Sequence, residues 1–163
     1  MRQEIELKHV GGHFFMVVDN QEWLIDTGCP ISFGNAQKIV ICERSFQIAN
    51  NYGYITIAAF AQHINNHFVG LIGTDILNAF DVTFNIREHK VVFDTDDTTL
   101  QGAHVNIVDF LDNNKPILEV TVNYQPIRMF FDTGAQLSYY QGNDFNNFPD
   151  AGDFKHSSKI LRA

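Results

Sequence analysis

The 163-residue sequence has few basic residues and no long apolar run, and each scarcity excludes a class of protein. Lysine and arginine total 11 against 19 aspartates and glutamates, which gives a formal net charge of −8. Proteins that bind nucleic acids or anionic membranes depend on clustered basic side chains, so we expect neither partner. No segment approaches the roughly 18 apolar residues of a membrane span, and the N-terminus lacks an apolar targeting region.

Cysteine is also scarce, since only Cys29 and Cys42 are present. Two cysteines cannot form a disulfide framework, and neither has the CxxC or Cys/His spacing of a zinc site. A single disulfide stays open, but nothing in the sequence requires it. Cys29 has no histidine at the spacing of a catalytic partner, so we expect a small buried side chain there. The sequence therefore predicts a soluble, cytoplasmic protein without metal or cofactor.

The residues that are abundant favour β-structure. Fifteen phenylalanines, many beside valine or isoleucine, are separated by turn-forming Asn, Asp and Gly. Three hairpins are predicted, pairing 14–18 with 22–25, 82–86 with 91–93, and 105–111 with 117–122. Helix is expected only in two short pieces, 56–64 and 74–80, the second capped by Thr74. The fold class predicted is mainly β with short helices.

An internal repeat is the most informative feature of the sequence. The segment Trp23-Leu24-Ile25-Asp26-Thr27-Gly28 recurs as Met129-Phe130-Phe131-Asp132-Thr133-Gly134. The match continues, because Cys29-Pro30-Ile31-Ser32 corresponds to Ala135-Gln136-Leu137-Ser138. Each copy also follows its own predicted hairpin. Duplication of one unit explains this better than two chance tripeptides, and the polar stretch 94–99 reads as the linker between the units.

The two Asp-Thr-Gly loops have a chemical consequence if a pseudo-twofold axis brings them together. Asp26 and Asp132 would then lie side by side in a partly desolvated cleft. Two carboxylates a few ångströms apart cannot both ionise easily, so they share one proton and titrate as a pair. Such a pair holds a general base and a general acid together, which allows peptide hydrolysis by an activated water without a metal.

These motifs resemble those of the aspartic peptidase superfamily, specifically its retropepsin-like and pepsin-like members. Their loops read hydrophobic-hydrophobic-Asp-Thr-Gly, as Leu24–Gly28 and Phe130–Gly134 do here. A second family signature, two hydrophobic residues and a glycine that thread behind the loop, is matched by Leu71-Ile72-Gly73. The resemblance implies Asp26 and Asp132 as the catalytic pair. It also implies four loop-supporting residues, namely Thr27, Gly28, Thr133 and Gly134.

The resemblance further implies a two-lobed β architecture in a single chain of bacterial type. We expect a first lobe at 1–97 and a partial second lobe at 98–163. Far fewer residues follow Gly134 than follow Gly28 within the first lobe, and no second hydrophobic-hydrophobic-Gly segment is present. Either the sequence is a piece of a longer protein, or a partner, such as a second copy in a homo-oligomer, completes the sheet. Only Asn50–Tyr54 could form the hairpin that covers substrate in the family.

Two functions from different classes follow from these expectations. The first is an aspartic endopeptidase that hydrolyses an extended peptide or unfolded protein. The alternative is a catalytically inactive module of the same fold that binds peptides or assembles with partners.

Two groups of residues have the composition of metal sites, and for both we favour a simpler interpretation. His63 and His67 have the spacing of a metal pair on a helix but no third ligand, so a solvated helix end is favoured. Asp94, Asp96 and Asp97 lack the glycine and terminal glutamate of a calcium loop, so a solvated linker is favoured. The C-terminal stretch 143–163 is polar, and we expect loop there.

Overall fold

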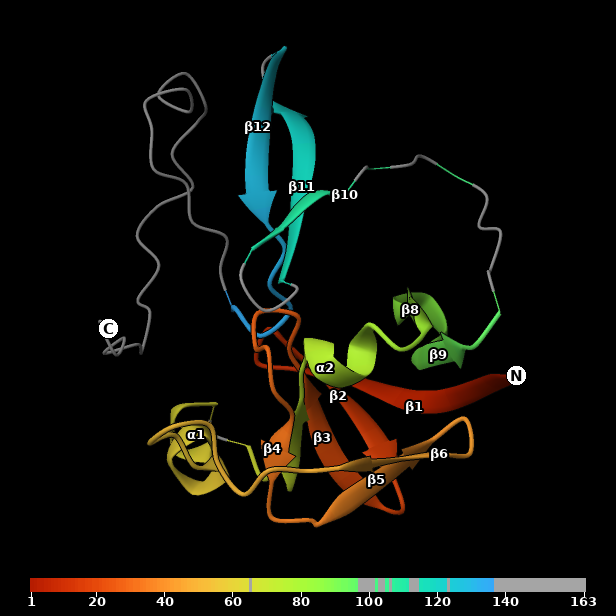
Figure 1. Cartoon of the computed structure of the whole chain (residues 1–163), viewed down its shortest axis with the longest axis vertical. Coiled ribbons are helices and arrows are strands. Elements are labelled where there is room, and N and C mark those ends of the chain that lie inside the picture. The colour runs from red at the N-terminus through yellow and green to blue at the C-terminus, as the bar shows by residue number, and fades with distance from the viewer. Residues whose placement is uncertain are drawn as a thin grey trace.

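The computed structural model describes residues 1–64, 66–96, 102, 105, 107–111, 115–122 and 124–136. Within these residues the chain is built mainly from β-strands with few short helices, which confirms the fold class expected from the sequence (Figure 1). Neither helix in the described part of the chain has the length and apolar character that crossing a membrane requires.

A seven-stranded sheet forms the larger body. Its strand order is β4-β7-β3-β2-β1-β9-β8, and all neighbouring strands are antiparallel except β3 and β7. The bounds are β1 (Arg2–Val10), β2 (His13–Val18), β3 (Gln21–Ile25), β4 (Phe33–Gly34), β7 (Gly70–Ile72), β8 (Asp81–Asn85) and β9 (Lys90–Asp94). A separate hairpin of β5 (Lys38–Ile41) and β6 (Arg44–Gln47) accompanies it.

Two predicted hairpins lie in this sheet. β2 and β3 pair antiparallel across Asp19 and Asn20, whose φ angles of 51° and 61° are those that a tight two-residue turn requires. β8 and β9 pair around the short 3-10 helix η1 (Ile86–Glu88). β1 was not predicted, although it lies inside the sheet and pairs with both β2 and β9.

The seven-stranded sheet buries apolar side chains on both faces, because successive strand residues point to opposite sides. Met16, Trp23 and Ile25 belong to one buried cluster, which the β5–β6 hairpin and α2 (Thr74–Leu77) help to form. Phe15 and Leu24 belong to a second cluster, against which α1 (Ile57–Ile64) packs. Burial on both faces gives the loop that leaves β3 a rigid base.

A second, three-stranded sheet contains the third predicted hairpin. Its strands are β10 (Ile107–Leu111), β11 (Lys115–Val122) and β12 (Gln125–Phe130), in that order. Figure 1 shows this sheet standing away from the seven-stranded sheet, with the two bodies meeting where β12 ends. Phe130 and Phe131 are 40% and 42% exposed, whereas Leu24 and Ile25, their counterparts in the repeat, are fully buried.

The helix predictions were correct in place but not in every detail. α1 occupies the predicted segment, whereas α2 ends at Leu77 and not at Phe80. The predicted cap is wrong: Gly73 is the N-cap residue, and the Thr74 hydroxyl instead donates to the carbonyl of Cys29.

Three further expectations concern connecting segments. The segment Asn50–Tyr54 contains only a tight turn, closed by paired backbone hydrogen bonds between Tyr52 and Ile55. The expected linker begins in β9, which ends at Asp94, and its residues 97–99 lie outside the described residues. The predicted C-terminal loop at 143–163 also lies outside them.

Candidate active site

The two Asp-Thr-Gly loops leave equivalent strands of the two sheets. Asp26 follows β3 directly, and Asp132 follows β12 after one residue. The parallel strand β7 lies beside β3, and the Asp26 amide donates to the carbonyl of Ile72 at 2.9 Å. Leu71 and Ile72, two of the three residues predicted to thread behind the loop, are therefore strand residues adjacent to it.

Reciprocal hydrogen bonds between the two threonines join the loops. The Thr27 amide donates to the Thr133 hydroxyl at 3.0 Å, and the Thr133 amide donates to the Thr27 hydroxyl at 3.0 Å. Each hydroxyl then donates to a carbonyl of the opposite copy, Thr27 to Phe131 at 2.7 Å and Thr133 to Ile25 at 2.9 Å. Both threonines are buried, so water does not compete for these bonds.

Across this junction each aspartate carboxyl group lies against the glycine of the opposite loop, close enough for the charge of Asp132 to act on Asp26. A Cβ atom placed on Gly28 would lie 2.5 Å from the Asp132 Cγ, and one on Gly134 would lie even closer to the Asp26 Cγ. Each carboxyl group also accepts the glycine amide of its own loop, at 2.8 Å from Gly28 and 2.9 Å from Gly134. Both glycines are thus required by the close approach of the opposite carboxyl group.

Electrostatics at the junction favour a protonated Asp26. Burial of its side chain, followed by the charge of Asp132, raises the pKa of Asp26 from its ordinary value to about 7. Asp26 is only 7% exposed, whereas Asp132 is partly exposed. Because burial penalises the charged form, Asp26 keeps its proton to a higher pH than an exposed aspartate would.

The segment from Gly73 to Asp75 forms hydrogen bonds with Cys29 and Ser32, which follow the first Asp-Thr-Gly motif. The Thr74 amide donates to the carbonyl of Cys29 at 2.9 Å, and a Cβ on Gly73 would lie 2.5 Å from that same oxygen. The Gly73 amide donates to the Ser32 hydroxyl at 2.9 Å. Asp75 in turn accepts the Ser32 amide and the Ser32 hydroxyl.

Sequence analysis assigned no role to Ser32 or Asp75. The available signal was an acidic residue two positions after Gly73 and a serine that recurs in both copies of the repeat. Neither residue can be recognised from the sequence alone, because the hydrogen bonds between them join positions 43 apart in the chain.

The thiol of Cys29 is a free, buried group, as expected for a residue without a catalytic partner. Burial raises its pKa to about 12, which keeps the unreactive thiol form at neutral pH. Cys42 is also a free, buried cysteine.

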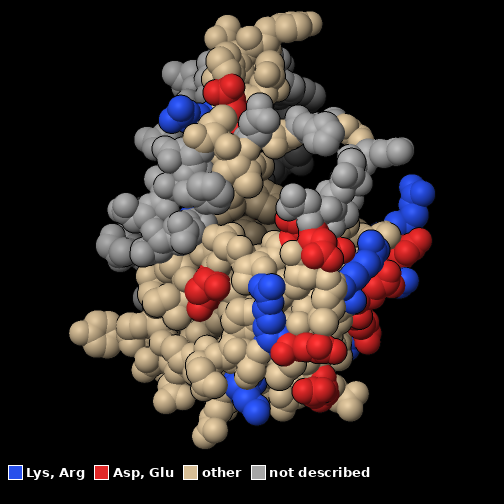
Figure 2. Space-filling view, turned by 45° about the vertical axis from the view of Figure 1, so that its right-hand side comes forward, with Lys and Arg blue, Asp and Glu red and all other residues tan. Residues whose placement is uncertain are grey.

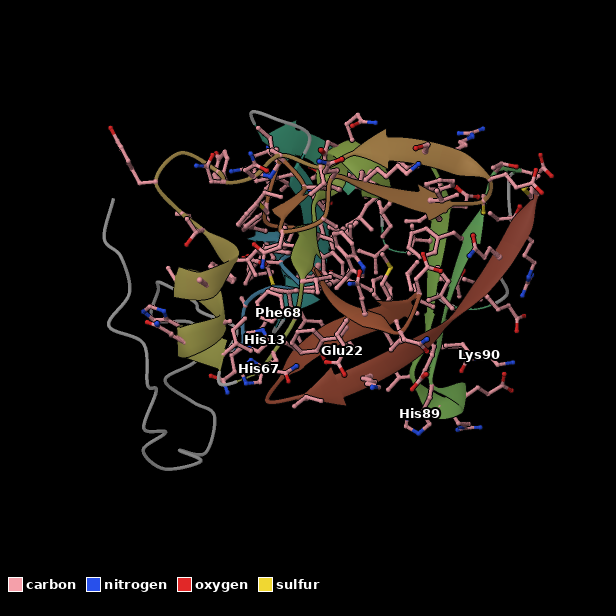
Figure 3. All side chains as sticks on the ribbon, turned by 90° about the horizontal axis from the view of Figure 1, so that it is seen from below. His13, Glu22, His67, Phe68, His89 and Lys90 are labelled. Atoms are coloured by element: carbon pink, nitrogen blue, oxygen red, sulfur yellow. The ribbon has the colours of Figure 1, made fainter. Side chains whose placement is uncertain are left out.

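The histidines of the described residues do not converge on one site. His63 lies on α1, is exposed and contacts the carbonyl of Ala59 at 2.8 Å, whereas His67 lies beyond the end of that helix. In Figure 3, His13 and His67 lie close together in the view, and His89 lies apart from them. Among the residues the structure describes, no cluster of three or more His, Cys, Asp or Glu side chains could hold a metal ion.

Acidic and basic side chains alternate on the face drawn in Figure 2, which has no large area of one sign. Among the ion pairs of the described residues are Lys8 with Glu22 at 2.8 Å and Lys90 with Glu4 at 2.9 Å. Such exposed pairs contribute little to stability.

No protein family, characterised protein or solved structure with which this chain was compared matches it. The function must therefore be argued from the geometry of the site.

Proposed function

We propose that the protein is an aspartic endopeptidase of the retropepsin-like or pepsin-like type, in which Asp26 and Asp132 activate a water molecule against a peptide carbonyl. The observation that carries the proposal is the close approach of each carboxyl group to the glycine of the opposite loop, on loops joined by Thr27 and Thr133. Hydrolysis by a carboxyl pair requires one protonated and one ionised member within reach of the same water.

Burial supports a division of roles between the two aspartates. Asp132, the more exposed member, is the general base and takes a proton from water as the water oxygen attacks the carbonyl carbon. Asp26, which retains its proton up to about pH 7, donates a hydrogen bond and then that proton to the carbonyl oxygen. The tetrahedral intermediate collapses when the C–N bond breaks: the nitrogen leaves with the proton that Asp132 had taken, and one hydroxyl returns a proton to Asp26 as the C=O bond re-forms. Both carboxyl groups thereby regain their starting protonation states.

The wider elements of the proposal follow from the repeat. The two sheets are the two lobes of the architecture, with the second incomplete among the described residues, and the substrate is an extended peptide or an unfolded protein. Because Cys29 and Cys42 are both free thiols, a reducing compartment such as the cytoplasm fits the chain.

The test is hydrolysis of an unfolded protein as a function of pH, in wild type and in Asp26→Asn, with and without pepstatin. We expect a bell-shaped profile whose alkaline limb lies near pH 7, because loss of the Asp26 proton removes the acid. Asp26→Asn should lower kcat by at least about 10³-fold, and pepstatin should inhibit the wild type. Absence of cleavage by folded wild type between about pH 3 and 8 contradicts the proposal.

A second candidate function is favoured by the exposed apolar side chains of the three-stranded sheet. Ile107 is 51% exposed, and Phe130 and Phe131 are similarly exposed. A second copy of the chain that covers this sheet would make the protein an assembly or peptide-binding module without catalysis. Sedimentation analysis discriminates the two, since a stable monomer that cleaves peptide contradicts the module.

A further inference from the structure

We propose that Asp75 is a positioning residue for the carboxyl pair, acting through Ser32 to hold the first Asp-Thr-Gly loop in its reactive position. The inference rests on the proposed function for its consequence in catalysis, but its structural part concerns the geometry of Asp26 alone. The hydrogen bonds of the Asp75 carboxylate go to Ser32 and to the Ile76 amide, so any influence on the carboxyl pair is indirect.

The carboxylate of Asp75 is engaged from three directions. Oδ1 accepts the Ser32 hydroxyl at 2.6 Å, and the Ser32 amide donates to Oδ1 at 2.9 Å and to Oδ2 at 3.0 Å. The amide of Ile76 also donates to Oδ1 at 3.0 Å. Asp75 itself is an exposed residue, so its carboxylate would be free to point into solvent if these donors did not hold it.

Ser32 connects Asp75 to the interior. It is 1% exposed, and its hydroxyl accepts the Gly73 amide at 2.9 Å while donating to Asp75. The Ser32 amide, buried with the rest of the residue, has the Asp75 carboxylate as its acceptor. Loss of that carboxylate therefore leaves a buried donor without its partner, which is more costly than loss of an exposed hydrogen bond.

The segment around Asp75 is also connected to the Asp26 loop by backbone hydrogen bonds. The segment that ends in Asp75 also supplies the Ile72 carbonyl to the Asp26 amide and the Thr74 amide to the Cys29 carbonyl. The loop from Asp26 to Ser32 is thus held at its first, fourth and last residues by one short segment. Removing the last attachment frees the end of the loop to move relative to that segment.

Movement of this loop should alter the carboxyl pair and not only the stability of the fold. The Gly28 amide, which holds the Asp26 carboxyl group, belongs to the same loop. A displacement of about 1 Å in a catalytic geometry can lower the rate by about 100-fold. Entry of water would also reduce the burial that, with the neighbouring charge of Asp132, sets the titration of Asp26.

The experiment compares Asp75→Ala, Asp75→Asn and Ser32→Ala with wild type, in the full chain. Glu6→Ala is the matched control, because it also removes one negative charge from an exposed position on β1. The first readout is the titration of the Asp26 carboxyl carbon by NMR, with Asp26→Asn used to assign the signal. The second is kcat and KM on an unfolded protein, and circular dichroism establishes that each variant is folded.

We expect Asp75→Ala to lower the pKa of Asp26 by at least about 1. Its kcat should fall by about 10- to 100-fold, with KM changed by less than about 3-fold. Asp75→Asn retains an oxygen that can accept from Ser32, so it should recover part of both losses. Ser32→Ala should move both readouts in the same direction, and combining it with Asp75→Ala should add little. Glu6→Ala should leave both unchanged.

Several outcomes overturn the proposal. One is a folded Asp75→Ala variant with wild-type titration of Asp26. Equal effects of Asp75→Ala and Asp75→Asn also overturn it, because loss of charge would then explain the result without hydrogen bonding. If Asp75→Ala does not fold, Ser32→Ala decides, and an unchanged titration there contradicts the positioning role. Inactivity of the wild type would instead contradict the proposed function, while the titration still decides the role of Asp75.

Discussion

At the scale of single residues, the burial of Asp26 has a cost that depends on pH. In the unfolded chain an aspartate has its ordinary pKa, near 3.8, whereas in the folded protein the pKa of Asp26 is about 7. Between these values the folded state binds the extra proton. The stability of the fold that depends on a protonated Asp26 is therefore fully present in acid, and it is lost as the pH rises through about 7.

Asp26→Asn should accordingly stabilise the fold relative to wild type as the pH increases. Asparagine carries no charge to desolvate, so the free energy of unfolding of the variant minus that of wild type should grow by more than about 1 kcal/mol between pH 4 and pH 8. Urea denaturation at several pH values measures the difference. Glu6→Gln serves as the exposed control, for which the difference should stay small. A constant difference for Asp26→Asn across this range contradicts the assigned burial effect.

Gly28 is the residue at which the smallest added group should do the most damage. A methyl group there would lie 2.5 Å from the Asp132 Cγ, so the opposite carboxyl group must rotate away or the loops must separate. Gly28→Ala should lower kcat/KM by at least about 100-fold.

Gly11→Asn is the control for Gly28→Ala. Gly11 has no neighbouring atom within 4 Å of an added Cβ, and asparagine tolerates its φ of 60°. Peptide hydrolysis should be retained in this variant. Wild-type kinetics in Gly28→Ala would show that the two carboxyl groups do not approach in solution as they do in the structure.

At the scale of elements, the sequence predicted the hairpins whose turns or spacing follow common rules. The β2–β3 turn contains Asp19-Asn20, which favours positive φ, and its prediction is confirmed. The β5–β6 hairpin was missed because its turn consists of Cys42 and Glu43, residues that rarely adopt the φ angles of 49° and 60° seen here. β1 was overlooked, although its apolar residues Ile5 and Leu7 alternate with charged residues. This alternation is typical of a half-buried strand.

The candidate site divides in the same way between what local sequence reveals and what only tertiary structure reveals. The duplicated motif was sufficient to single out both aspartates and both threonines, because a repeated tripeptide is visible without any fold. Ser32 and Asp75 could not be singled out, since their importance lies in hydrogen bonds between distant segments. The failed cap of Thr74 has the same cause: its hydroxyl donates to the Cys29 carbonyl in the neighbouring loop.

The three-stranded sheet should be the less protected of the two sheets. Among the side chains of β10, β11 and β12 whose burial the structure describes, only the neighbours Pro116 and Ile117 are buried. Few buried contacts mean a small free energy of local opening. Hydrogen exchange followed by mass spectrometry should find amides of β11 and β12 exchanging at least about 10-fold faster than those of β2 and β3. Equal protection in a demonstrated monomer contradicts this expectation.

At the scale of the whole molecule, the net charge of −8 should influence which substrates are captured. An acidic protein attracts cationic peptides over distances that salt shortens. A peptide flanked by lysines should therefore have a higher kcat/KM than the same peptide flanked by glutamates at 20 mM salt, and the ratio should fall by about 3-fold or more at 500 mM. A ratio independent of salt would indicate that direct contacts with the peptide alone set the preference.

Because of the reciprocal hydrogen bonds between Thr27 and Thr133, a substitution at one of these positions affects the other half of the chain. Each hydroxyl serves the amide of the other copy, so a change in either threonine leaves an unsatisfied group in the opposite half. A library that randomises both positions should therefore return functional clones as matched pairs, and rarely as single replacements. Two segments of similar sequence are in this way prevented from diverging independently at the point where they touch.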